Sequence, residues 1–411
     1  MIIINEEDVV ETTNIKMSIT TYSTNLTNLT NLTNLTNDKN IFKKLTNSVD
    51  YPNLPLRIKE YITWIYENMG LIIHTKLSSS DNEWIDTQVK YRYGKAYKDI
   101  NNKNYKVLRP TIKSYQPINR WLTRYDDSLQ KIENCYNAWA KYRHEETLGQ
   151  IIVYNLLTSN SNNTLLPLLM VDTMGPLDTP FWTYNRRVGL NAPYFQEHIL
   201  WPLCSHRIEF SKGLDDKIIW KDKMQKIVFR GVTTGPLHNT INNNPTKTSR
   251  FEIINKWHMM DWADMGFNNI IDQTRKDSYW QYYKNDVRKL LKPRLTIETM
   301  LQNKFVLCIE GNDVSTAYGW VLASNSVPIH PYPYIYEIWY FQGLIPWIHF
   351  IPCNINGSDI GDIMAWAEDH DDECQKIAKA GHEYMQKMLD PIKYIEILKR
   401  MYDIWDLQVK E

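Results

Sequence analysis

The sequence predicts an α/β protein made of two layered parts, and three observations support this prediction. Short apolar runs typical of buried strands, such as KIVFRG (226–231) and KFVLCIEG (304–311), alternate with helical patterns. Each of these two runs ends in a polar turn that contains a glycine. The length of 411 residues also exceeds that of one ordinary domain. We therefore expect two α/β domains rather than an all-α or all-β protein.

Composition excludes several classes of protein. The 43% hydrophobic content is ample for sizeable cores, and Lys+Arg and Asp+Glu balance at 47 each. A net charge of zero argues against a whole-protein electrostatic grip on nucleic acid or on an anionic membrane. The five cysteines lie far apart without a CxxC motif or a Cys/His cluster. This spacing favours reduced core thiols over a disulfide framework or a structural zinc site.

The N-terminal region, residues 1–43, is expected to be a disordered low-complexity extension. It contains the repeat TNLTNLTNLTNLTN (24–37), which has four Asn-Leu-Thr sequons and no helical or strand period. A glycosylated stalk is the alternative, but the first residues lack the basic start and long apolar segment of a secretory signal. No uncharged run approaches the ~20 residues that span a bilayer. We expect a cytoplasmic protein without a membrane span.

Residues 44–215 are predicted to form the first α/β domain. The segment PLRIKEYITWIYENMG (55–70) has helical spacing of apolar residues and a glycine stop. Further along, QIIVYNLLT (150–158) and TLLPLLMVD (164–172) are interpreted as buried strands around an Asn/Ser-rich loop.

Residues 216–375 are predicted to form the second domain, and residues 376–411 to be helices that pack back across both. After the strand at 226–231, helical patterns run over 250–262 and from about 277 to 291. A strand, a small-residue helix and a second strand follow at 305–309, 314–322 and 326–330. Three more helices are expected, the first capped by Ser358-Asp359, the second by Asp371-Asp372, and the last by Asp390 with Pro391 at the first helical position.

The polar turns after the two strands are the candidate binding site. In an open parallel sheet, ligands bind outside the carboxyl ends of the strands. Gly231 and Gly311 would let the backbone approach a ligand or would simply form a tight turn. Amides near Asn312-Asp313 could hold a phosphate, or these residues could only cap the next helix. Neither GxGxxG nor GxxxxGK[ST] occurs, so dinucleotide binding and P-loop chemistry have no support.

A family resemblance is carried by four segments in order: KIVFRGVTTG, KFVLCIEGNDVSTAYGWVLASNSVPI, EIWYFQGLIPWIHFIP and DIGDIMAWAEDHDDECQKIAKAGHEYM. Over roughly residues 165–390 they resemble glycosyltransferase family 90, which includes LpsA-type, capsule-associated and Rumi-type enzymes. The resemblance implies a GT-B-like fold, in which two Rossmann-like domains face each other across a cleft. It also implies inverting sugar transfer (glucose or xylose) from a UDP-sugar to a glycan or protein acceptor, without a metal or other cofactor.

The resemblance further implies which residues hold the UDP-sugar. The expected donor-binding set is Arg230, Gly231, Thr233, Thr234, Arg250, Glu310, Gly311, Asn312, Asp313, Ser315 and Thr316. The chain departs from the family where Thr233 and Ala317 replace arginines of Rumi-type members and where Gly319 replaces a lysine common in LpsA-type members. Arg250 matches an arginine that commonly follows the first motif, and it is expected to supply positive charge.

An inverting transferase also needs a carboxylate that accepts the proton of the acceptor hydroxyl. The family places this aspartate in an Asp-x-Pro setting after a strand of the N-terminal half. Asp178 has the tripeptide, Asp178-Thr179-Pro180, whereas Asp172 directly follows the predicted strand. Both are candidates, with Asp178 preferred, and either could instead be a turn or cap aspartate.

Three other features are interpreted as structural. The acidic run EDHDDE (368–373) is expected to be a solvated junction between two helices, His349 a hydrogen-bonded core residue, and the aromatic residues of 332–347 packing elements. A catalytically inactive sugar- or nucleotide-binding protein of the same fold is the main alternative function. A binder of single-stranded nucleic acid is a weaker one, because the net charge is zero.

Overall fold

A computed structural model describes residues 64–65, 77–86, 153, 157, 168–169, 182–188, 199–200, 202, 204–238 and 248–410. The chain divides into two units, residues 1–52 and 53–411, and all described residues belong to the second. The predicted extension 1–43 therefore lies outside the described residues.

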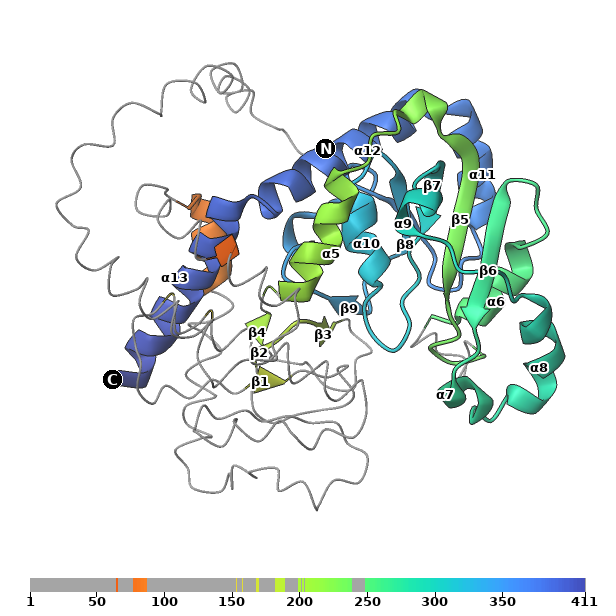
Figure 1. Ribbon diagram of the computed structural model, residues 1–411, viewed down its shortest axis with the longest axis horizontal. Coiled ribbons are helices and arrows are strands. Elements are labelled where there is room, and N and C mark those ends of the chain that lie inside the picture. Colours follow the sequence, from red (N-terminus) through yellow and green to blue (C-terminus); the bar gives the residue numbers. More distant parts are fainter. Residues whose placement is uncertain are drawn as a thin grey trace, which may run out of the picture. The chain divides into compact units, whose positions relative to one another are not determined.

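The second unit contains a five-stranded parallel sheet with the strand order β10-β8-β7-β5-β6. Figure 1 labels β5, β6, β7 and β8 of this sheet. Its strands are β5 (Met224–Val232), β6 (Ala263–Asn269), β7 (Asn303–Leu307), β8 (Val327–Pro331) and β10 (Ile351–Cys353). Strands β5 and β7 are direct parallel neighbours, with Ile227 opposite Phe305. The predicted mixed α/β class and the shared sheet of these two strands are thus confirmed.

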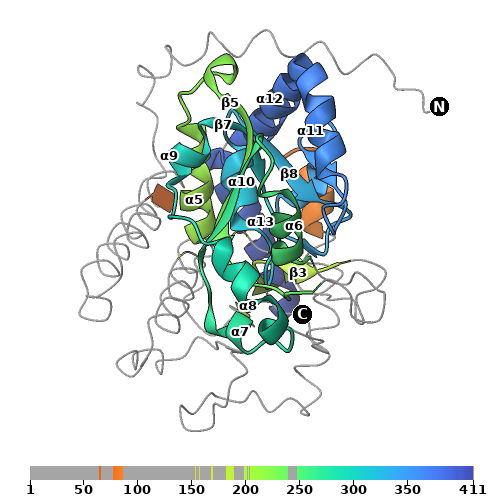
Figure 2. The same cartoon turned by 90° about the vertical axis from the view of Figure 1, so that its right-hand side faces the viewer.

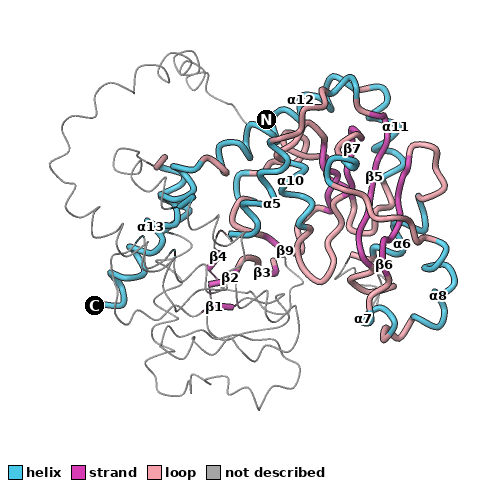
Figure 3. The backbone as a smooth tube through the Cα atoms, in the orientation of Figure 1, coloured by secondary structure: helices cyan, strands magenta, loops and turns pink. Residues whose placement is uncertain are grey.

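Helices pack against the sheet and against one another (Figures 2 and 3). Alternate strand residues such as Phe229, Phe305 and Leu307 share one apolar core with residues of α6 (Arg250–Trp257) and α11 (Ile360–Asp369). Burying such side chains is the main source of stability of a layered α/β fold. Further α-helices in the described ranges include α5 (Cys204–Leu214), α7 (Asp272–Arg275), α8 (Trp280–Lys289), α9 (Ile297–Met300), α10 (Thr316–Leu322), α12 (Asp371–Met388) and α13 (Pro391–Lys410).

Helices α5 and α10 approach each other closely because two glycines lie at their contact. A Cβ atom on Gly319 would overlap the ring of Phe210, and one on Gly213 would overlap the carbonyl oxygen of Trp320. Phe210 is fully buried. Gly319, one of the departures from the family pattern, therefore has a steric reason in this chain: a lysine side chain there would occupy the space of Phe210.

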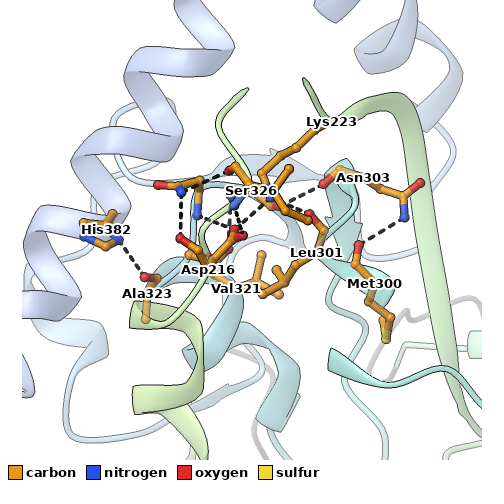
Figure 4. Close-up of polar contacts among 12 residues, drawn as sticks. Asp216, Lys223, Met300, Leu301, Asn303, Val321, Ala323, Ser326 and His382 are labelled. Atoms are coloured by element: carbon orange, nitrogen blue, oxygen red, sulfur yellow. Dashed lines mark hydrogen bonds and ion pairs between the residues drawn. The ribbon is translucent and has the colours of Figure 1, made fainter. Parts of the chain in front are cut away.

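At the amino edge of the sheet, a buried ion pair joins the connection between α5 and β5 to the strands (Figure 4). Lys223 Nζ donates to Asp216 Oδ2 over 2.8 Å, and to the carbonyl of Leu301. The second donor to Asp216 Oδ2 is the backbone N–H of Asn325, at 3.0 Å. Both charged side chains are almost completely buried, at 0% and 2% exposure. A buried pair is tolerated only when its polar atoms are bonded in this way.

Two smaller sheets accompany the large one. Strands β1 (Leu168–Leu169), β2 (Trp182–Thr183) and β4 (Ile199–Leu200) pair in parallel, in the order β1-β2-β4. Strand β3 (Arg186–Arg187) pairs antiparallel with β9 (Tyr336–Glu337), which follows β8 in the chain. The predicted strand in TLLPLLMVD is confirmed at β1.

Some predicted elements differ from the structure. In the predicted strand 150–158, the described residues Val153 and Leu157 are helical. Both are buried and lie one helical turn apart, so their spacing serves one face of a helix. The pattern over 250–262 ends as α6 at Trp257, and the pattern from 277 begins as α8 only at Trp280, after the short α7. Periodicity locates such helices better than it locates their ends.

The C-terminal helices α11 and α13 begin directly after Asp359 and Asp390, as predicted, whereas α12 begins at Asp371, so Asp371 and Asp372 lie in its first turn and do not cap it. Asp390 caps α13 in the expected way, because its carboxylate accepts the N–H of Lys393 at 3.0 Å. Cys308, Cys353 and Cys374 are free and buried, which confirms the core-thiol prediction for these three.

Candidate functional site

The carboxyl edge of the five-stranded sheet brings together the loops after β5 and β7. Gly311, in the turn after β7, lies so close to the β5 loop that a Cβ atom there would overlap Thr234 Oγ1 and approach the Arg250 guanidinium. Gly235 in the β5 loop has a φ of +85° and faces the carbonyl of Gly311. Gly311 is therefore required by the close approach of the two loops, and Gly235 is required by its left-handed backbone conformation.

Arg250, the first residue of α6, connects the two loops. Its guanidinium donates to the carbonyls of Val232 (3.1 Å), Ile309 (2.8 Å) and Glu310 (3.0 Å), and also to Thr234 Oγ1. Burial lowers its pKa to about 10, while the charges of Asp313 and Glu310 oppose that shift. The guanidinium stays protonated at neutral pH and fixes the geometry of this edge.

Glu310 is buried beneath the turn. Its carboxylate accepts hydrogen bonds from the backbone N–H of Tyr336 at 3.3 Å and from the Thr248 hydroxyl at 3.4 Å. Burial raises the pKa of Glu310 to about 8, although these hydrogen bonds and Arg250 favour the charged form. The side chain faces the protein interior, and it holds the turn from below.

Asn312 and Thr233 tie the site to the segment around α7. The Asn312 side chain accepts the N–H of Gly235 at 3.4 Å and donates to Gln273 Oε1 at 3.0 Å. Thr233 is buried, and its hydroxyl accepts the N–H of Ile271 at 3.1 Å. The Thr274 hydroxyl lies 2.8 Å from the Thr233 hydroxyl and also donates to the Thr233 carbonyl. An arginine at position 233 would have to displace this packed network.

Asp313 is held by residues that the sequence analysis did not single out. Its Oδ2 accepts hydrogen bonds from the Tyr184 hydroxyl at 2.5 Å and from Asn185 Nδ2 at 3.1 Å. Both donors are buried. They belong to FWTYNRRV (181–188), whose polar and aromatic mix gave no periodic signal. The only available clue was its position just after the Asp178-Thr179-Pro180 motif.

Ser315 and Thr316 stand at the start of α10. Ser315 occupies the N-cap position and is buried, but its hydroxyl makes no capping hydrogen bond. Thr316 is exposed. The prediction that Asn312 or Asp313 caps this helix is not what the structure shows, since both side chains bond to other segments.

Arg230 is engaged away from this cluster. Its guanidinium donates to Asp264 Oδ1 at 2.7 Å and to the carbonyl of Asp264 at 2.8 Å. Lys292 donates to the same carboxylate oxygen at 2.9 Å. The two cations lower the pKa of Asp264 against the opposing effect of burial. Gly231, the next residue in β5, pairs with Phe267 of β6. Of the eleven predicted donor-binding residues, Thr234, Glu310 and Gly311 lie directly against Arg250.

Asp172 and Asp178, the candidate bases, lie outside the described residues. In the acidic run 368–373, Asp371 accepts hydrogen bonds from Lys304 Nζ at 2.6 Å and from Trp220 Nε1 at 3.1 Å, so it ties α12 to the sheet. Within the described ranges, no group of three or more His, Cys, Asp or Glu side chains is arranged to hold a metal ion.

The aromatic residues of 332–347 divide into packed and exposed members. Trp339, Tyr340 and Phe341 are buried, as predicted, whereas Tyr332 and Trp347 are 41% and 48% exposed. His349 is half-buried, and its Nδ1 accepts the N–H of Ile345 at 2.9 Å. Burial lowers the pKa of His349, which agrees with a neutral structural residue.

Comparison with known proteins supports the family resemblance. Residues 214–400 match the model of glycosyl transferase family 90. This region contains β5 to β10 and the whole cluster of Thr234, Arg250, Glu310 and Gly311. The resemblance expected from the four sequence segments is therefore confirmed over this part of the chain.

Relatives occur in viruses, bacteria and animals. The chain is 28% identical over 183 residues to the uncharacterized protein 027R of Frog virus 3, covering 41% of this chain and 18% of that protein. It is 29% identical over 98 residues to O-glucosyltransferase LpsA of Dichelobacter nodosus, covering 24% of this chain and 30% of that protein. It is 33% identical over 86 residues to protein O-glucosyltransferase 2 of Danio rerio, covering 21% and 17%.

The chain thus spans less than one fifth of the length of the first viral relatives that it matches. Among the helices in the described ranges, none combines the length and the apolar character needed to cross a bilayer.

Proposed function

We propose, from the match of residues 214–400 to the glycosyl transferase family 90 model, that this protein is an inverting, metal-independent glycosyltransferase that uses a UDP-sugar. The observation that carries the proposal is the convergence of two family segments at one sheet edge. The segment after β5 and the segment after β7 meet through Arg250 and Gly311. The carboxyl edge of a parallel sheet is where α/β proteins bind nucleotides.

The donor side of the reaction belongs to this edge. The diphosphate of a UDP-sugar would be held by the turn 310–316 and by the hydroxyls of Ser315 and Thr316. Arg250 lies beneath the same turn and contributes fixed positive charge, because four of its hydrogen bonds go to neutral oxygens. Charge that develops on the leaving UDP is stabilised best by such preorganised groups.

The acceptor side would belong to the N-terminal half, which gives the complete GT-B arrangement of two Rossmann-like domains across a cleft. The parallel pairing of β1, β2 and β4 in that half supports this architecture. Asp172 follows β1 in the chain and Asp178 precedes β2. One of these carboxylates would accept the proton of the acceptor hydroxyl while its oxygen attacks C1 of the sugar and the bond from C1 to UDP breaks. The configuration at C1 is inverted as a result.

The acceptor is a glycan or a protein, and the sugar is glucose or xylose. The names of two relatives, O-glucosyltransferase LpsA and protein O-glucosyltransferase 2, support glucose. Relatives in iridescent and frog viruses fit a role in the synthesis of a viral or host-surface glycan.

The first experiment measures UDP release and sugar transfer with a panel of UDP-sugars, in chelator and with added manganese. Full activity in chelator supports the metal-free mechanism, whereas activity that requires manganese contradicts it. Binding of each UDP-sugar is measured in parallel by calorimetry. Binding without any transfer or hydrolysis would favour the alternative, an inactive sugar-binding protein. Thr233 is the residue that supports this alternative, because it replaces an arginine of Rumi-type members and is hydrogen-bonded to the segment around α7.

The second experiment identifies the base. Asp178→Asn keeps size and polarity but cannot accept the proton, so turnover should fall by about 10²- to 10⁴-fold. The loss should appear in kcat rather than in the KM for the donor, because the proton moves only in the transition state. Asp172→Asn is the matched variant. If both variants transfer sugar at nearly the parental rate, the base is another residue.

A further inference from the structure

We infer that Tyr184 and Asn185 are positioning residues that set the conformation of the donor turn 310–316 by holding Asp313. This inference rests on the proposed function and adds to it a connection between the acceptor half and the donor half. It starts from the convergence of two buried donors, one hydroxyl and one amide, on a single carboxylate oxygen, Asp313 Oδ2.

The hydrogen bonds to Asp313 are of the strong kind. A hydroxyl that donates to a carboxylate over 2.5 Å has the short length of a charge-assisted bond. The Tyr184 side chain is 3% exposed and Asn185 is completely buried, so water competes little for Asp313 on this side. Asp313 also attracts Arg250, the side chain that braces the turn from the other side.

The segment that carries these donors is itself fixed to β9, which follows β8 of the large sheet in the chain. Strand β3 pairs with β9, and the N–H of Val188 donates to the carbonyl of Ile335 at 2.8 Å. Arg186 forms an ion pair with Glu337 of β9. Tyr184 and Asn185 therefore approach Asp313 from an anchored backbone, which is what a positioning role requires.

The turn transmits the position of Asp313 to the rest of the site. The N–H of Gly311 donates to the carbonyl of Asp313 at 3.0 Å, so Asp313 closes the loop that contains Gly311 and Asn312. Release of the Asp313 side chain would loosen this loop.

The test compares Tyr184→Phe with the parent protein and with Tyr282→Phe as the matched control. Tyr282 lies in α8 with 78% of its surface exposed, so its hydroxyl is not part of the site. Amide hydrogen exchange is followed for the peptide 308–318 without ligand. Tyr184→Phe should accelerate this exchange by about tenfold, because one charge-assisted bond is lost, while the melting temperature stays near that of the parent.

Calorimetry with UDP gives the second readout. Tyr184→Phe should raise the Kd for UDP by about 3- to 10-fold, and the effect should disappear in an Asp313→Ala background. A merely structural residue would instead lower the melting temperature without this dependence on Asp313. Asn185→Ala should change exchange and affinity in the same direction, which provides a second variant if Tyr184→Phe folds poorly.

Exchange and UDP affinity equal to those of Tyr282→Phe would overturn the inference. So would an undiminished effect of Tyr184→Phe in the Asp313→Ala background. If the parent protein binds no UDP, the proposed donor fails, but exchange in 308–318 still decides whether Tyr184 holds the turn.

Discussion

The amino edge and the carboxyl edge of the five-stranded sheet contain the same kinds of polar residue, but these residues have different roles. At the amino edge, the side chains of Asp216 and Lys223 are almost completely buried and bond to the chain around Leu301 and Asn325. At the carboxyl edge, Arg250 bonds to two loops and Asp313 to a third segment. The amino-edge bonds join the ends of strands that already pair, whereas the carboxyl-edge bonds fix loops that have no ladder between them.

This difference separates stability from function. A strand end can move little, so a polar network there contributes mainly to the free energy of unfolding. A loop can adopt several conformations, so a network there selects the one that can bind a ligand. Variants at the two edges should therefore divide between loss of stability and loss of donor affinity.

The largest effect is expected at the amino edge. Asp216→Ala leaves the buried ammonium of Lys223 without its counter-charge, which should lower the free energy of unfolding by about 3–5 kcal/mol. Urea denaturation measures the loss, and the UDP affinity of the folded protein should not change. Asp215→Ala is the control, because Asp215 precedes Asp216 in the chain and is exposed. A loss no greater than in this control would mean that the ion pair does not stabilise the fold.

Arg250→Ala should lower both the free energy of unfolding and the affinity for UDP. It removes four hydrogen bonds and leaves the carbonyls of Val232, Ile309 and Glu310 without this donor. We expect a loss of about 1–3 kcal/mol in unfolding free energy and a comparable loss in UDP binding. Denaturation and calorimetry give the two values, with the exposed Arg294→Ala as control. Unchanged UDP affinity would leave Arg250 with a structural role alone.

The pH dependence of Glu310, followed over a single pH unit, should be the smallest of these effects. Burial raises its pKa from 4.5 to about 8 in the folded protein, so the folded state binds more protons than the unfolded state between these values. Its contribution to stability is therefore complete below pH 4.5 and is lost as pH rises through 8. Relative to Glu310→Gln, the parent should lose about 1 kcal/mol between pH 5 and pH 6, because one pH unit within this window corresponds to about 1.4 kcal/mol. The free energy of unfolding in urea is measured against pH for the parent and for Glu310→Gln. If the two curves run parallel, the predicted titration of Glu310 is wrong.

The sequence predicts the large sheet well and the surroundings of the turn poorly. Apolar runs and polar strand ends located β5, β7 and β8, because burial imposes a regular pattern on strands. The same runs misled at 150–158, where Val153 and Leu157 belong to a helix. A short apolar run has no period that distinguishes a buried helix from a buried strand.

The candidate site was predicted in its residues but not in its contacts. Glycines and acids after two strands indicated the turn, and the structure shows Thr234, Arg250, Glu310 and Gly311 in contact. Local spacing carries no information about Tyr184, which is 129 residues from its partner Asp313. The pairing of Arg230 with Asp264 could not be predicted from the sequence either, because it depends on which strand lies beside β5.

The β3–β9 pair has a consequence for how the polypeptide can be divided. Residues 214–400 match the family model, yet β9 within that region pairs with a strand that lies before it in the chain. Excision at residue 214 would remove β3 and leave Glu337 without Arg186. It would also remove α5, whose Phe210 fills the space beside Gly319. We therefore expect the autonomous folding unit to be larger than the segment that matches the family model, and a stable expression fragment to begin upstream of residue 182.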